Sequence, residues 1–176
     1  MDLRLADMFK IFHETSLVTI ASVHGHTLAG GGGLAASCDI VLLDEQAKMG
    51  FPEVRRGLVA AEVMAILLRQ ICLRYVRELL LTGQLVDSYR AVEIGLANYI
   101  VTHEDLEKEA LRIAEEVLKG GPEAIRESKY LLNKLFSGDF SINIDLALSV
   151  HDRVRHSQEA KDGIAAFLEK RKPVWD

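Results

Sequence analysis

Four consecutive glycines, Gly30–Gly33, constrain this chain more than any other feature of its sequence. They follow a charge-free apolar run at Leu17–Val23, and they precede an apolar stretch, Leu34–Cys38, with room for barely two helical turns before the next buried run at Asp39–Leu43. Glycine lets a ligand approach the main chain closely, and unpaired N–H groups at a helix start favour negative charge. A mobile linker is the alternative, but linkers seldom join a buried strand to an apolar helix. We therefore predict a strand, a ligand-facing glycine loop and a short helix.

Two phosphate-binding motifs contain such glycines, and neither fits this segment. A P-loop needs Lys-Ser or Lys-Thr after the glycines, and this chain has no such pair there. Gly30, Gly32 and Ala35 match the spacing of the dinucleotide fingerprint, but its full crossover helix has no room before Asp39. An oxyanion site remains, in which a main-chain N–H at a helix start holds a developing negative oxygen.

An oxyanion site needs an acid/base group nearby, and Glu53 is the best candidate. It follows Pro52 and a short strand predicted at Ala47–Gly50, in a mostly apolar setting. A carboxylate placed there can act as a general base. A glutamate after proline is more often a helix N-cap or a first-turn acid. The residues alone leave both interpretations open.

The remaining candidate groups favour structure over chemistry. His24 and His26 flank a glycine, but no third ligand follows at a recognisable spacing, so we predict turn histidines and no metal site. Cys38 and Cys72 lie in apolar surroundings without CxxC spacing, which predicts two buried thiols in a reducing compartment.

Charge and hydropathy exclude several classes of protein. The net charge is −5, and no basic stripe is present, so we expect no nucleic-acid or anionic-membrane partner. The longest apolar-rich run, 58–71, is interrupted by charges and is shorter than the roughly 20 residues of a membrane span. No secretory signal is visible, so the expectation is a soluble cytoplasmic protein.

Composition divides the chain near residue 102. Residues 1–102 hold 9 of the 13 glycines, whereas residues 103–176 hold 27 charged residues in 74 positions. Strands alternate with helices in the first region, which indicates an α/β class, and the second reads as nearly continuous helix. Helices are predicted at 2–13, 60–72, 74–81, 87–95, 104–119, 122–136, 142–156 and 158–170, and strands at 17–23, 39–43, 47–50 and 97–101.

Three segments resemble the crotonase, or enoyl-CoA hydratase/isomerase, family in order and spacing. They read SLVTIASVHGHTLAGGGGLAASCDIVLLDEQAKMGFPEVRRGLVAA (16–61), LTGQLVDSYRAVEIGLANYIV (81–101) and AFLEKRKPVW (166–175). The resemblance implies an α/β fold in which residues 1–102 form part of a ββα spiral core that carries the site. Residues 103–176 would then form a C-terminal helical region that builds a homo-trimer or hexamer. About the first third of a typical member has no counterpart here.

The resemblance also implies roles for particular residues. Gly30 aligns with the second of two main-chain oxyanion donors, and Glu53 aligns with the second catalytic glutamate. Phe167 and Lys170 match a C-terminal segment that contacts coenzyme A. Neighbours of the two catalytic positions, Gly31, Phe51 and Pro52, are further expected contacts of the substrate. The substrate that the resemblance implies is an acyl-CoA thioester, and no metal or other cofactor is implied.

One departure from the family pattern bears on the reaction. Typical hydratases carry a glutamate three residues after the donor glycine, and this chain has Gly33 there. Two carboxylates hold the added water in such hydratases, whereas one suffices to move a double bond between carbons. We therefore keep three expectations: an isomerase, a specialised hydratase, and an inactive structural or assembly subunit. A related serine-protease function has little support, because no serine–histidine constellation is recognisable.

Overall fold

The computed structural model describes residues 2–135 and 140–175. These residues group into two compact units, the first ending at Ala114 and the second beginning at Glu115. The first unit extends past the change in composition at residue 102 because Leu106 and Ile113 pack with the fully buried Leu42 in one apolar cluster. The division of functional regions into 1–102 and 103–176 stays a prediction.

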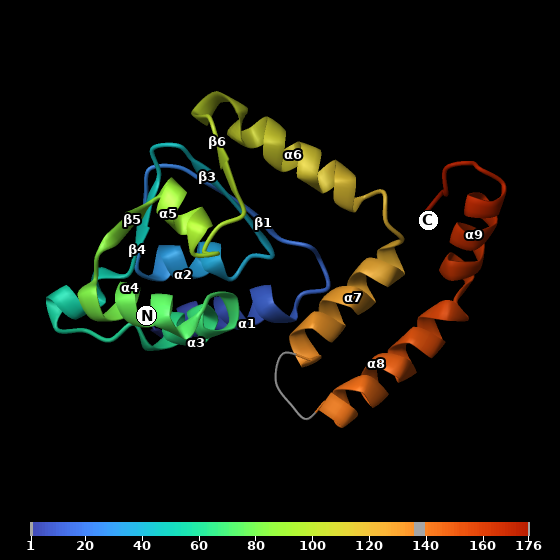
Figure 1. The fold of residues 1–176 in the computed structure, drawn as a ribbon, viewed down its shortest axis with the longest axis horizontal. Coiled ribbons are helices and arrows are strands. Elements are labelled where there is room, and N and C mark those ends of the chain that lie inside the picture. The colour runs from blue at the N-terminus through green and yellow to red at the C-terminus, as the bar shows by residue number, and fades with distance from the viewer. Residues whose placement is uncertain (1, 136–139, 176) are drawn as a thin grey trace. The chain divides into compact units, whose positions relative to one another are not determined.

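Two three-stranded sheets form the framework of the first unit (Figure 1). The first sheet is wholly parallel and has the order β1 (Ile20–Val23), β3 (Ile40–Asp44), β6 (Tyr99–Val101). The second has the order β2 (His26–Leu28), β4 (Lys48–Gly50), β5 (Leu85–Asp87), with β2 parallel and β5 antiparallel to β4. The α/β class is confirmed, and the short strands β2 and β5 were not predicted.

Helices pack on these strands, and Figure 1 shows α2 between the strands and helices α1 and α3. The helices are α1 (Asp2–Glu14), α2 (Gly30–Ala36), α3 (Ala61–Gln70), α4 (Leu73–Thr82) and α5 (Ser88–Glu93), with short 3-10 helices η1 (Pro52–Arg56) and η2 (His103–Asp105). Asp87 caps α5 at the start of the predicted helix 87–95, since its carboxylate accepts the Arg90 N–H at 2.8 Å. Gly83 ends α4 in the left-handed conformation, with a φ of +61°.

Two expectations about burial were wrong. The run at Leu17–Val23 was predicted to form a buried strand, yet Ser22 in β1 is exposed, and β1 is an edge strand of its sheet. Cys72 was predicted to be buried, but it precedes the first residue of α4 and is exposed, whereas Cys38 is buried as expected.

The second unit consists of helices. After the end of α6 (Leu106–Val117) come α7 (Pro122–Leu135), α8 (Phe140–Arg155) and α9 (Gln158–Leu168), close to the predicted bounds. The carboxylate of Glu159 accepts the main-chain N–H groups of Glu123 and Ala124, at 2.6 and 2.8 Å, and so caps the start of α7. Trp175 donates its indole N–H to the Lys119 carbonyl at 3.1 Å, and its ring lies against Gly163.

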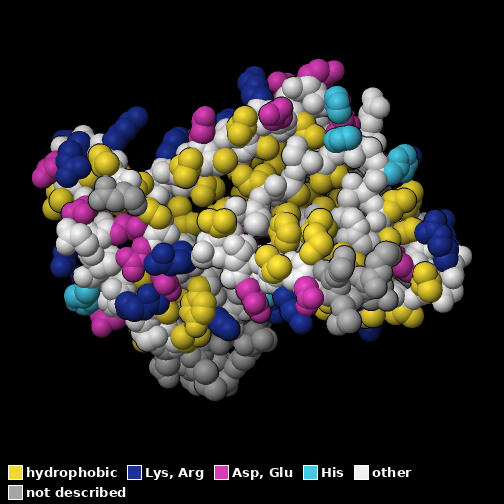
Figure 2. All heavy atoms as spheres, turned by 180° about the vertical axis from the view of Figure 1, so that it is seen from behind, with side chains coloured by type: hydrophobic (Ala, Val, Ile, Leu, Met, Phe, Trp, Pro, Cys, Tyr) yellow, Lys and Arg dark blue, Asp and Glu magenta, His cyan; other side chains and the backbone are white. Residues whose placement is uncertain are grey.

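Apolar side chains also reach the surface, where they appear in yellow among charged groups (Figure 2). They include Leu17 in the first unit and Leu148, Ile164, Phe167 and Leu168 in the second. In the part of the chain that the structure describes, no helix has the length and apolar character that a membrane crossing needs.

Candidate active site

The four glycines were predicted to form a loop before a short helix, but they form the first turn of α2 itself, and the sharp turn from β2 into α2 lies at Ala29. Ala29, at the turn, has a φ of +53° and a ψ of −127°, a conformation that residues with a side chain rarely adopt. Its N–H donates to the Gly50 carbonyl at 2.9 Å, and its carbonyl accepts the Gly33 N–H at 2.9 Å. The turn is therefore fixed at both sides. The first-turn N–H groups of α2, Gly30 among them, have no intrahelical acceptor because of their position. No side chain caps this end of the helix either.

The glycines of this turn differ in what surrounds them. A Cβ placed on Gly31 would meet nothing within 4 Å. On Gly32 it would lie 2.9 Å from the Phe51 ring, and on Gly33 it would lie 2.8 Å from both Phe9 and Val63. Gly31 thus leaves main chain open to a ligand, while Gly32 and Gly33 are required by close packing.

Glu53 lies in the first turn of η1, just after β4. Its Oε2 atom is buried and has no hydrogen-bond partner, and it is the one such side-chain atom among the described residues. A buried, unsatisfied carboxylate oxygen is costly and calls for an explanation. β2 and β4 are parallel neighbours that pair Leu28 with Gly50, so the segments with Gly30 and Glu53 both follow the carboxyl ends of these strands, at the same end of the sheet.

Two of the predicted substrate contacts, Phe51 and Pro52, lie between β4 and Glu53. Phe51 is completely buried in the core, where its ring supports Gly32, and Pro52 begins η1 and is also buried. Both hold the main chain between β4 and Glu53. A direct contact of either residue with a substrate stays a prediction.

A hollow of about 380 Å³ lies beside Gly31. It is lined by Phe12 of α1, by β1 and the following residue His24, by Thr27, and by residues of and just after α2: Gly31, Leu34, Ala35 and Cys38. No lysine, arginine, aspartate or glutamate is among these lining residues. The surface next to the open glycine is therefore mainly apolar.

Comparison with known proteins identifies the family of the chain. The sequence profile of the enoyl-CoA hydratase/isomerase family matches residues 3–176. The chain belongs to the enoyl-CoA hydratase/isomerase family. A Thermus thermophilus protein whose name places it among enoyl-CoA hydratases is 40% identical over 169 residues, which cover 94% of this chain and 67% of that protein. The short-chain-enoyl-CoA hydratase of Clostridium acetobutylicum is 30% identical, with coverage of 93% and 64%.

Solved structures of proteins named as enoyl-CoA hydratases are also similar to this chain. The enoyl-CoA hydratase of Mycobacterium smegmatis superposes with a TM-score of 0.94 at 26% identity, covering 99% of this chain and 68% of that one. The chain spans 56% and 60% of the lengths of related proteins from Arabidopsis thaliana and Bacillus subtilis. The crotonase-like fold expected from the sequence is confirmed.

The two residues expected from the family's coenzyme A segment lie in the second unit. Phe167 is in the last turn of α9 and is 80% exposed. Lys170 follows the helix with a φ of +55°, and it too is exposed. Their role in binding coenzyme A stays a prediction.

Sequence reasoning missed a polar cluster at the carboxyl end of the β1-β3-β6 sheet. His103 Nδ1 lies 2.7 Å from Asp44 Oδ2, and the His24 and His103 rings meet edge to face with centroids 5.6 Å apart. The Gln46 N–H, at 2.6 Å, and then His103 hold the pKa of the buried Asp44 below its usual value. Each of the three residues ends or closely follows a parallel strand. Their positions at strand ends were the sequence signal that could have predicted the cluster.

Within residues 2–135 and 140–175, no three His, Cys, Asp or Glu side chains are grouped to hold a metal ion.

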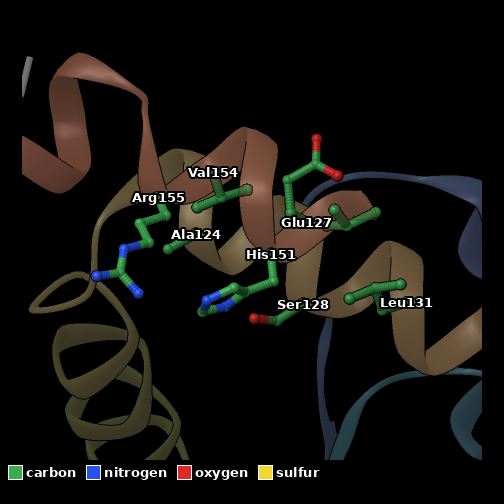
Figure 3. Close-up of a pocket in the computed structure, with 8 residues that line it drawn as sticks. Ala124, Glu127, Ser128, Leu131, His151, Val154 and Arg155 are labelled. Carbon is green, nitrogen blue, oxygen red and sulfur yellow. The ribbon is translucent and has the colours of Figure 1, made fainter. Parts of the chain in front are cut away.

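A second hollow, of about 390 Å³, lies between α7 and α8 of the second unit (Figure 3). Ser128 and His151 lie close together there, while the Glu127 carboxylate points away from His151 and pairs with Arg153 at 2.6 Å. No hydrogen bond joins Ser128 to His151 in the described part of the chain. The hollow therefore lacks the hydrogen-bonded base that an activated serine requires.

Proposed function

We propose that this chain acts on acyl-CoA thioesters, moving or hydrating a C=C bond through an enolate. The Gly30 N–H would hold the thioester oxygen, and Glu53 would transfer the proton. The observation that carries the proposal is the buried Oε2 atom of Glu53, which has no hydrogen-bond partner. The segment with Glu53 follows the carboxyl end of β4, beside the end of β2 that leads into the glycines. A proton-transferring carboxylate needs an oxygen that is not already occupied by the protein.

Isomerisation needs only these groups. Glu53 would take a proton from C2 of a 3-enoyl-CoA, and the electron pair would move onto the thioester oxygen to give a dienolate. The Gly30 N–H would stabilise the charge on that oxygen. Return of the same proton to C4 would give the 2-enoyl-CoA and restore the carboxylate, so protons and electrons balance without a second acid.

Hydration would use Glu53 differently. The carboxylate would take a proton from water as the oxygen adds to C3 of a 2-enoyl-CoA, and Glu53 would return that proton to C2 of the enolate, which completes the product and restores the carboxylate. Gly33 cannot offer a second carboxylate, and its position is closed by Phe9 and Val63. This packing favours isomerisation over the two-carboxylate form of hydration.

The direct test is Glu53→Gln, which preserves the shape of the side chain and removes the proton acceptor. Purified wild-type and variant chains are assayed with a 3-enoyl-CoA for isomerisation and a 2-enoyl-CoA for hydration. We expect a loss of about 100-fold or more in kcat with little change in KM, because general-base catalysis contributes roughly that much. Unchanged turnover by the variant would refute the role of Glu53.

A catalytically inactive structural or assembly subunit is the second candidate. The closed position at Gly33 favours it, since one of the family's two carboxylates is replaced by packing. Isothermal titration with an acyl-CoA distinguishes the two functions. Binding by both wild-type and Glu53→Gln chains supports the enzyme, whereas no binding at millimolar acyl-CoA supports the structural subunit.

We also propose that the second unit joins copies of the chain into a trimer or hexamer. Exposed apolar side chains on α9, among them Ile164 and Leu168, support this. Light scattering of Leu168→Ser should then show a smaller assembly than wild type, while Lys161→Ala on the same helix leaves the assembly intact. A wild-type monomer would contradict the proposal.

A further inference from the structure

The turn that carries Glu53 is held against the end of α4. Arg55, two residues after Glu53 in η1, donates its Nε–H to the Thr82 carbonyl at 3.0 Å. Thr82 is the last residue of α4, where main-chain carbonyls have no intrahelical donor and the helix dipole favours a positive charge. The Arg55 side chain therefore satisfies the end of α4 from the same short helix that contains Glu53.

Gly83 allows α4 and η1 to approach each other closely. It follows α4 with a φ of +61°, and a Cβ placed on it would lie 3.1 Å from side-chain atoms of both Val54 and Arg55. Any larger residue at this position would press on η1. The hydrogen bond to Thr82 thus belongs to a packed contact between the two segments.

The chain that follows α4 also packs on the residues before Glu53. β4 and β5 are antiparallel neighbours that pair Gly50 with Leu85, and a Cβ on Gly50 would lie 2.5 Å from the Leu85 side chain. Residues 82–85 therefore contact the chain on both sides of Glu53. Since Glu53 Oε2 accepts no hydrogen bond from a described residue, its place depends on how the main chain around it is held.

We propose that Arg55 is a positioning residue for Glu53. Its hydrogen bond to Thr82 holds η1 against α4 and so keeps the Glu53 carboxylate where it receives the proton. This inference rests on the proposed role of Glu53 as the proton acceptor. Arg55 is exposed, so solvent screens its charge, and its contribution comes from the donated hydrogen bond.

Two substitutions of similar length separate the hydrogen bond from the charge. Arg55→Gln places an N–H donor at the position of Nε without a charge, whereas Arg55→Met has no donor. Arg55→Met should lower kcat for the acyl-CoA reaction about threefold to tenfold with little change in KM, because a displaced catalytic group slows the chemical step. Arg55→Gln should restore most of this loss. Arg56→Met, which removes the neighbouring exposed arginine, is the control and should leave kcat unchanged.

Hydrogen exchange in η1 measures how firmly the turn is held, independently of catalysis. The Leu58 N–H donates to the Glu53 carbonyl at 3.0 Å, so its exchange with solvent reports on this turn. Exchange at Leu58 should be about threefold to tenfold faster in Arg55→Met than in wild type or Arg55→Gln. Gly83→Ala should speed this exchange too. Gly95→Ala, also at a positive φ but with no contact closer than 3.9 Å, should not.

Three results would overturn the inference. One is unchanged Leu58 exchange in Arg55→Met, and another is faster exchange with an unchanged kcat. The third is an Arg55→Gln variant as impaired as Arg55→Met, which would assign the effect to charge. A wild-type chain without activity would refute the proposed function instead. Leu58 exchange would then still decide whether Arg55 holds the turn.

Discussion

Replacing Gly33 by alanine puts a methyl group where two buried side chains already lie. The new Cβ would be 2.8 Å from the Phe9 ring and 2.8 Å from a Val63 methyl, well inside normal carbon–carbon contact. Phe9 and Val63 are 5% and 3% exposed, so neither can move freely into solvent. Gly31, two residues earlier in the same helix, has open space around the same added methyl group and is the matched control.

The expected magnitudes follow from two opposing terms. Overpacking of a buried site costs roughly 1–3 kcal/mol, and alanine in place of glycine in a helix recovers about 0.5–1 kcal/mol. Gly33→Ala should therefore lower the free energy of unfolding by about 1–2 kcal/mol. Gly31→Ala should raise it by up to about 0.5 kcal/mol, since this position is in the first turn.

Urea unfolding followed by circular dichroism measures this difference. With a urea dependence of about 2 kcal/mol per molar, the two midpoints should differ by roughly 1 M. Phe9→Leu removes the tip of the ring, so the double variant Phe9→Leu/Gly33→Ala should be more stable than the sum of the single effects predicts. Equal midpoints for Gly31→Ala and Gly33→Ala would show that packing does not require glycine at position 33.

Three further changes test separate parts of the structure. Ala29→Gly should raise the free energy of unfolding by about 1 kcal/mol in urea titration, because glycine adopts the positive φ at this turn without strain; a loss of stability would contradict this. The folded pKa of Asp44 lies below the unfolded value of 3.8, so its stabilising effect is present above that pH and lost as the pH falls through the folded pKa. Asp44→Asn should therefore flatten the decline of unfolding free energy in acid, and an unchanged slope would refute the assignment. Glu159→Gln removes the charge from two main-chain hydrogen bonds and should destabilise the second unit by about 1–2 kcal/mol in thermal unfolding, whereas Glu169→Gln should not.

Local signals predicted most helices because their causes are local. Helices were predicted to start at positions 122 and 87, and Pro122 begins α7 while Asp87 caps α5. β2 was missed because His26–Leu28 has only three residues, and its extended form depends on pairing with β4, more than twenty residues later. Pairing with a strand far along the chain produces almost no recognisable sequence pattern in a segment this short.

The candidate site was only partly predictable for the same reason. The sequence pointed to the glycine run and to Glu53, but it could not say which glycine faces open space. That depends on Phe9 and Val63, which approach Gly33 from outside its own segment. The pairing of Asp44 with His103 spans 59 residues and follows from strand order alone.

The placement of Trp175 determines what intrinsic fluorescence can report. It is the single tryptophan of the chain, and its indole is tied to Lys119 and Gly163 within the second unit. Selective tryptophan excitation should thus follow the melting of the helical unit, with the sheets and the glycine turn left spectroscopically silent. A fluorescence trace and a circular dichroism trace recorded on one sample would reveal whether the two halves of the polypeptide lose their order together or in turn.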